Sequence, residues 1–229
     1  MSTLELVQTQ EPENGDPIAT IKTSLGDIKV VLYPEYAPNA VKNFTDLAES
    51  GYYDNTYVFN SEPGVYFGAG SPNKNGDLNK DNEQAALEYE QELHQNLWPF
   101  KGALCSLTTS EEGGFWKKFK GESKILNGSR FAVLNSVEFT EDLKKELLES
   151  DKNTTLAEAF IEYGGCPSLS QKITVFGQTY EGFDVIDKLT SLEITDSEDG
   201  TKIPVEDIMI ETICLLYTSP SPRDMRRSR

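Results

Sequence analysis

The most informative stretch of the chain reads Gly51-Tyr-Tyr-Asp-Asn-Thr-Tyr-Val-Phe-Asn-Ser-Glu-Pro-Gly-Val-Tyr-Phe-Gly-Ala-Gly-Ser-Pro72. Glycine and proline recur at its start, at Pro63-Gly64 and at its end, which is typical of turns between short β-strands. The apolar residues after the central turn predict a strand over residues 65–69. The stretch therefore indicates a turn-rich β architecture.

The segments on either side extend this pattern. Residues 18–24 and 27–33 are β-rich runs around Leu25-Gly26 and predict a hairpin, because apolar and polar residues alternate in the second run. Two other segments, residues 38–50 and 181–192, show apolar residues at helical spacing. Further short strands are expected at residues 102–108, 129–134, 173–176 and 205–213. Together they predict a mainly β fold, a closed antiparallel eight-stranded barrel capped by two helices.

Five motifs, in order along the chain, resemble those of cyclophilin-type peptidyl-prolyl cis-trans isomerases. The opening stretch is similar to the central segment of that family, G-Y-Y-D-G-x-x-F-H-R-x-x-P-G-F-M-x-Q-G-G-D-P. The other four are Tyr33-Pro-Glu-Tyr-Ala-Pro38, Lys101-Gly-Ala-Leu-Cys-Ser-Leu107, Asn127-Gly-Ser-Arg-Phe131, and Val175-Phe-Gly177 with Glu181-Gly-Phe-Asp-Val-Ile186. The resemblance covers most of residues 17–213 and implies a cyclophilin-like β-barrel domain over that range.

Several segments exceed the family pattern. Residues 1–16 form an N-terminal extension, and residues 73–100, 109–126 and 137–167 enlarge the loops of the expected barrel. The last of these has apolar residues at helical spacing, so we expect a helical excursion there. Such enlarged loops are where the individual binding properties of a protein are expected to lie.

The last sixteen residues are predicted to have a separate origin. Residues 214–224 can be encoded by the transposase adapter of short-read sequencing libraries, read in frame, and the first base of that adapter completes a codon for Ile213. We therefore expect residues 214–229 to be a sequencing-adapter or assembly scar. The alternative is a natural basic tail, for which Arg226, Arg227 and Arg229 would be typical.

The overall charge restricts the partners. The chain has 21 Lys and Arg against 38 Asp and Glu, a formal net charge of −17, which disfavours nucleic acid and anionic membrane surfaces. No stretch approaches a signal peptide or a membrane span, and the three Cys lack the spacing of a disulfide framework or a zinc site. Residues 77–88 carry the acidic positions of an EF-hand loop, but the residues before them cannot form its first helix, so a solvated loop is expected. We expect a cytoplasmic monomer that needs no metal and no other cofactor.

The resemblance also implies a function, which is to bind Pro-containing segments of client proteins and to isomerise their X-Pro bonds. The barrier of about 18–20 kcal/mol arises from the partial double bond of the imide, so the reaction needs no nucleophile. Family members are understood to bind the twisted form with an apolar cup for the proline ring and an arginine near the prolyl nitrogen. Asn60 stands in the place of that arginine.

Other groove positions implied by the resemblance have changed as well. The positions expected to bind substrate are Val65, Tyr66, Gly68, Leu107, Thr108, Phe131, Ala132, Leu169 and Ile173. Arg130 replaces a glutamine on the neighbouring strand, so Asn60 and Arg130 are the candidate catalytic residues. The alternative for Arg130 is an ion pair with an acidic residue of the rim.

Two functions follow from this pattern. Because a neutral amide makes weaker hydrogen bonds than a charged group, the first is an isomerase of reduced activity. The second is a non-catalytic cyclophilin-like module whose enlarged rim binds one protein partner.

Overall fold

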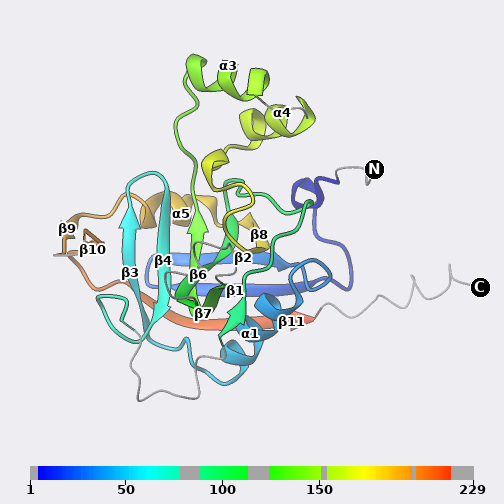
Figure 1. Cartoon of the computed structure of the whole chain (residues 1–229). Coiled ribbons are helices and arrows are strands. Elements are labelled where there is room, and N and C mark those ends of the chain that lie inside the picture. Colours follow the sequence, from blue (N-terminus) through cyan, green and yellow to red (C-terminus); the bar gives the residue numbers. More distant parts are fainter. Residues whose placement is uncertain (1–4, 78–87, 113–123, 151–153, 198–199, 218–229) are drawn as a thin grey trace, which may run out of the picture.

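The computed structural model describes residues 5–77, 88–112, 124–150, 154–197 and 200–217. Its centre is a closed β-barrel (Figure 1). The strands follow one another in the order β4-β3-β11-β1-β2-β8-β6-β7, and β7 pairs with β4 to close the ring. Every one of these pairings is antiparallel. The predicted eight-stranded barrel is confirmed.

The strands agree with the predicted segments, with some differences in length. Those of the barrel are β1 (Pro17–Thr23), β2 (Gly26–Leu32), β3 (Thr56–Glu62), β4 (Tyr66–Ser71), β6 (Ala103–Glu112), β7 (Lys124–Leu134), β8 (Val175–Glu181) and β11 (Met209–Tyr217). Outside the ring, β5 (Tyr89–Glu90) pairs with β7, and β9 (Ile194–Asp196) pairs with β10 (Lys202–Pro204).

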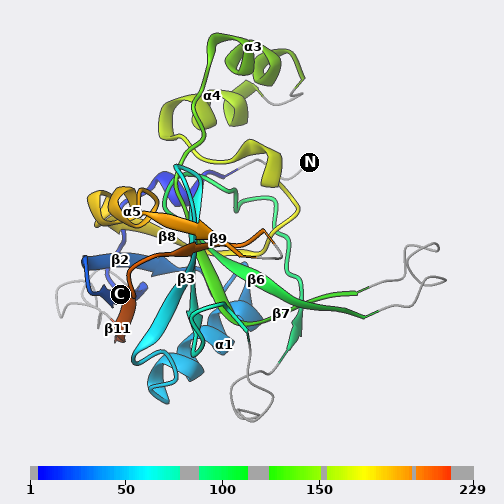
Figure 2. The ribbon, with the colours of Figure 1, turned by 90° about the vertical axis from the view of Figure 1, so that its left-hand side faces the viewer.

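The sequence predicts an enlarged loop at residues 109–126. In the structure the two ends of this insertion continue β6 and β7 as a β-hairpin. The pairing of β6 with β7 continues from Thr108 with Asn127 out to Glu112 with Lys124. Figure 2 shows this hairpin projecting from the barrel. The acidic loop expected at residues 77–88 lies mostly outside the described residues.

Both predicted capping helices are present. Helix α1 (Pro38–Glu49) has proline in its first turn and buries Val41, Phe44 and Leu47 on the core. Helix α5 (Phe183–Leu189) is shorter than residues 181–192 because Gly182, at its N-cap, has φ of +97°. The two helices lie on opposite sides of the barrel (Figures 1 and 2).

The helical excursion expected within residues 137–167 is also present. Helices α3 (Glu141–Ser150) and α4 (Thr154–Tyr163) project from one end of the barrel (Figure 1). Helix α4 buries Leu156, Ala159 and Phe160 against Phe100, in a second apolar cluster separate from the main core. No helix among the described residues has the length and apolar character needed to cross a membrane.

The N-terminal extension packs on the rest of the chain through Val7 and through the buried side chain of Gln8. Gln8, in the 3-10 helix η1 (Val7–Thr9), is 7% exposed. Its Nε2 donates to the Trp98 carbonyl at 2.9 Å and to Gln178 Oε1 at 2.8 Å. At the other end of the chain, β11 continues past Ile213 and pairs with β1 as far as Tyr217 opposite Pro17.

Candidate functional site

Three barrel strands, β3, β4 and β7, place residues of the expected groove on one face. Phe67 of β4 pairs with Val133 of β7, and both side chains are buried in the core. Because side chains alternate along a strand, the adjacent pair, Gly68 and Ala132, faces away from the core. Asn60 of β3 pairs with Gly68 from the other side. Asn60, Gly68 and Ala132 therefore form one row across the outer face.

A β-bulge in β3 adds an aromatic side chain to this face. Val58 pairs with Ala69 and Asn60 pairs with Gly68, so Phe59 is the extra residue between them. The Phe59 ring is 5% exposed and lies outside the main core cluster. A bulge redirects side chains locally, and here it places a phenyl ring in the groove.

Phe59 and Leu107 meet above Gly68 and fill the centre of the groove. A Cβ atom at Gly68 would lie 3.1 Å from Phe59 Cζ and 3.4 Å from Leu107 Cδ1. The contact with Phe59 would be closer than ordinary packing and the contact with Leu107 is at its limit, so a side chain longer than one carbon has to displace them. The bottom of the expected proline cup is therefore occupied by apolar side chains of the chain itself.

A polar pair lies at one end of the groove. Asn60 Nδ2 donates a hydrogen bond to Tyr66 Oη at 2.9 Å. Asn60 Oδ1 is buried and has no hydrogen-bond partner among the described residues. Burial raises the pKa of the Tyr66 hydroxyl, while the hydrogen bond from Asn60 opposes that effect. The hydroxyl of Tyr66 therefore remains protonated and neutral at physiological pH.

Arg130, at the other end of the groove, links two backbone segments through its guanidinium group. Its Nη1 donates to the Gly76 carbonyl and its Nη2 to the Thr108 carbonyl, both at 2.9 Å. The guanidinium carbon lies 5.7 Å from the centre of the Phe59 ring, which is a cation–π distance. Burial lowers the pKa of Arg130, while Asp77 raises it. Among the described residues Arg130 therefore bonds to two backbone carbonyls, and the predicted alternative of an ion pair with an acidic residue of the rim stays a prediction.

The structure separates Phe131 from the other expected groove residues. Phe131 is 1% exposed, and its ring packs in the core. The centre of the ring lies 5.6 Å from that of Phe44 and 5.5 Å from that of Tyr53. The reason is strand alternation, since its neighbours Arg130 and Ala132 face outward.

Three expected residues flank the row. Val65, Leu169 and Ile173 are half-buried and pack against the edge of the core. The Cys166 thiol, just before the 3-10 helix η2 (Pro167–Leu169), lies 3.9 Å from the Val65 carbonyl. This contact places η2 next to the start of β4, so Val65 and Leu169 belong to the same end of the groove as Tyr66.

Two residues of the groove were missed by the sequence reasoning. Phe59 fills the centre, and Gly76 allows the ring to lie there, because a Cβ at Gly76 would be only 2.5 Å from Phe59 Cδ2. The aromatic residue next to Asn60 was the only available signal. The bulge that turns Phe59 outward depends on pairing between strands, which a single motif does not reveal.

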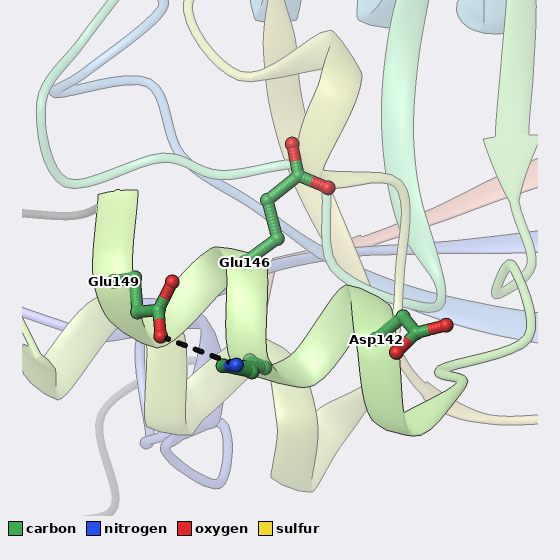
Figure 3. Close-up of a pocket in the computed structure, with 4 residues that line it drawn as sticks. Asp142, Glu146 and Glu149 are labelled. Carbon is green, nitrogen blue, oxygen red and sulfur yellow. Dashed lines mark ion pairs between the residues drawn. The ribbon is translucent and has the colours of Figure 1, made fainter.

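A recess on helix α3 is a weaker candidate for a functional site. It is lined by Asp142, Lys145, Glu146 and Glu149. Figure 3 shows the three carboxylates pointing in different directions, with Glu149 paired to Lys145 at 3.8 Å. Among the residues that the structure describes, no group of three or more His, Cys, Asp or Glu side chains is arranged to hold a metal ion.

Comparisons with known proteins agree with the fold. The family model described as "Cyclophilin type peptidyl-prolyl cis-trans isomerase/CLD" matches residues 18–214. A "Putative bifunctional phosphatase/peptidyl-prolyl cis-trans isomerase" of Streptococcus pyogenes is 32% identical over 92% of this chain, which spans 41% of that protein. A "Putative peptidyl-prolyl cis-trans isomerase" of Staphylococcus aureus is 26% identical over 89% of this chain and 94% of its own length.

Solved structures show the same fold. A crystal structure of a cyclophilin-type peptidyl-prolyl cis-trans isomerase of Cryptosporidium parvum has a TM-score of 0.60 at 21% identity. The match covers 88% of this chain and 97% of the other.

Proposed function

The chain belongs to the cyclophilin-type peptidyl-prolyl cis-trans isomerase family, and on this premise we propose that it binds Pro-containing segments of client proteins and isomerises their X-Pro bonds at a reduced rate. The names of the S. pyogenes and S. aureus relatives support the activity. A second crystal structure of the C. parvum protein was determined in the presence of the dipeptide Ala-Pro, which supports the substrate class.

One observation carries the proposal, which is the outward row of Asn60, Gly68 and Ala132. Phe59, which is buried, and Leu107, which is half-buried, lie over Gly68, so that Leu107 is the apolar side chain there that a proline ring can contact. The Asn60–Tyr66 pair stands beside that surface. An isomerase has to bind the twisted imide better than the planar one, and an apolar floor next to fixed hydrogen-bond donors meets that need.

The contacts of Arg130 support a positioning role for it. Its two terminal nitrogens are engaged by the carbonyls of Gly76 and Thr108, and its guanidinium lies over Phe59. We propose that Arg130 holds Phe59 and Thr108 in place, so that the groove keeps its shape when a peptide binds.

The test is an exchange measurement by NMR on a short X-Pro peptide with and without the protein. We expect wild-type protein to accelerate cis–trans exchange above the uncatalysed rate. We expect Arg130→Ala to lose most of that acceleration because Phe59 and Thr108 are released. Lys42→Ala, an exposed change on helix α1, is the matched control and should keep the wild-type rate.

A non-catalytic binding module is the second candidate, and the filled centre of the groove favours it. Phe59 and Leu107 leave less depth for a proline ring than an open cup would. In that case the peptide binds saturably in the NMR titration, yet wild-type protein does not change its exchange rate. That result would contradict the isomerase proposal.

We further propose that the protein acts as a cytoplasmic monomer. All three cysteines are free, and Cys105 and Cys166 are buried, which suits a reducing compartment. Size-exclusion chromatography with light scattering tests the oligomeric state, and a mass near twice 25.5 kDa would contradict a monomer.

A further inference from the structure

The hydroxyl of Tyr66 is the feature of the expected groove on which this inference is based. Tyr66 Oη accepts the hydrogen bond from Asn60 Nδ2 at 2.9 Å. Among the described residues no acceptor receives the Tyr66 proton. Arg130 is held differently, because Nη1 and Nη2 each donate to a backbone carbonyl and its Nε is buried, without a partner among the described residues.

The position of Tyr66 is suited to contact with a bound peptide. Tyr66 and Gly68 are two residues apart on β4, so both face the groove. Tyr66 pairs with Glu62, and Gly68 pairs with Asn60, so the phenol ring reaches diagonally across to Asn60. Its hydroxyl consequently lies beside Asn60, the first residue of the row formed by Asn60, Gly68 and Ala132.

We propose that Tyr66 is the catalytic hydrogen-bond donor of this groove, and that Asn60 is the positioning residue that orients it. This inference rests on the proposed isomerase function. In the planar imide the nitrogen lone pair is delocalised, and twisting about the C–N bond localises it on nitrogen. A donor aimed at that nitrogen stabilises the twisted form more than the planar one, which is the condition for catalysis.

The hydrogen bond between Asn60 and Tyr66 has two effects on that donor. By occupying the acceptor side of Oη, Asn60 leaves the O–H free to point away from it. A hydrogen bond accepted by the oxygen also polarises the O–H, since chains of hydrogen bonds strengthen one another in a low-dielectric site. Burial raises the pKa of Tyr66, so the proton is retained. A neutral donor is weaker than an arginine, which accounts for the reduced rate that we propose.

The central experiment compares Tyr66→Phe with wild type in the NMR exchange assay, with peptide affinity measured on the same samples. The ring is kept and only the hydroxyl is lost. We expect the maximal exchange rate to fall about tenfold or more while the peptide dissociation constant changes less than about twofold. Tyr163→Phe, on the projecting helix α4, removes a hydroxyl elsewhere and should leave both quantities unchanged.

Substitutions of Asn60 test the orientation of Tyr66. In Asn60→Asp the carboxylate accepts a hydrogen bond from the Tyr66 hydroxyl, which is then no longer available to the peptide, so the rate should fall as far as in Tyr66→Phe. In Asn60→Arg a charged donor takes over, so the rate should rise, and adding Tyr66→Phe to that variant should have little further effect. A thermal unfolding curve for each variant shows that it is folded.

The outcomes separate this inference from the proposed function. If wild type catalyses exchange and Tyr66→Phe does so equally well, the role of Tyr66 is wrong and the isomerase function stands. If wild type binds the peptide and catalyses nothing, both are wrong. If Asn60→Asp keeps the wild-type rate while Tyr66→Phe loses it, the positioning role of Asn60 is wrong.

Discussion

At Gly68 the absence of a side chain determines what the groove can contain. A Cβ atom placed at Gly68 would lie 3.1 Å from Phe59 Cζ and 3.4 Å from Leu107 Cδ1. These two side chains therefore occupy the space that a larger residue would need. The replacement of the family's glutamine by Gly68 is therefore linked to the side chains of Phe59 and Leu107. Glycine at 68 and phenylalanine at 59 are two parts of one packing arrangement.

We predict that Gly68→Gln, which introduces the residue of the family pattern, destabilises the protein by about 1–3 kcal/mol through overpacking. Urea unfolding at constant m measures this loss. In a Leu107→Ala background the same substitution should cost less, because the space has been vacated. Equal costs in both backgrounds would show that Leu107 and residue 68 do not compete for space.

At the scale of single elements, helix α5 is held by a small polar network. Asp187 Oδ1 accepts hydrogen bonds from Lys101 Nζ at 2.8 Å and from Asn135 Nδ2 at 3.0 Å. The hydrogen bond from Lys101 is the main reason that the pKa of Asp187 is lowered. This network ties α5 to the end of β7 and to the segment that precedes β6.

We predict that Asp187→Asn lowers the free energy of unfolding at pH 7 by about 0.2–1 kcal/mol, a small value because the side chain is largely exposed. A lowered pKa means that the stabilisation is present above the pKa of the unfolded chain and is lost as pH falls through the folded value. The difference between the variant and wild type should therefore shrink in acid. Glu206→Gln serves as an exposed control, and a difference that does not depend on pH would contradict the electrostatic explanation.

At the scale of the whole molecule, the barrel is closed by strands from opposite ends of the chain. β11 pairs with β1 from Thr23 opposite Ile210 to Pro17 opposite Tyr217. The pairing thus includes Cys214 to Tyr217, inside the segment that we expect to be a scar. Strand pairing is made by backbone groups, so these residues complete the edge of the barrel whatever their origin.

We predict that a chain ended after Ile213 is less stable than one ended after Tyr217 by about 1–3 kcal/mol, because it loses hydrogen bonds of the ladder and the contact of Leu215 with the core. Urea unfolding of the two chains measures the difference. The chain ended after Tyr217 keeps the whole strand and is the matched comparison. Equal stabilities would show that the last part of β11 contributes nothing to closure.

The barrel could be predicted from the amino-acid sequence, because the signals for it are local. The signals are alternating apolar residues, turns at glycine and proline, and apolar residues at helical spacing, each of which acts over a few residues. They predicted the β1–β2 hairpin and helix α1. The sequence also showed that the arginine of the family pattern is replaced by Asn60. The side chains that fill the groove could not be predicted in this way, because a bulge in β3 and the pairing of β3, β4 and β7 bring distant residues together. That pairing put Phe59 over Gly68, turned Phe131 into the core, engaged Arg130 with two carbonyls, and placed the hydroxyl of Tyr66 beside Asn60.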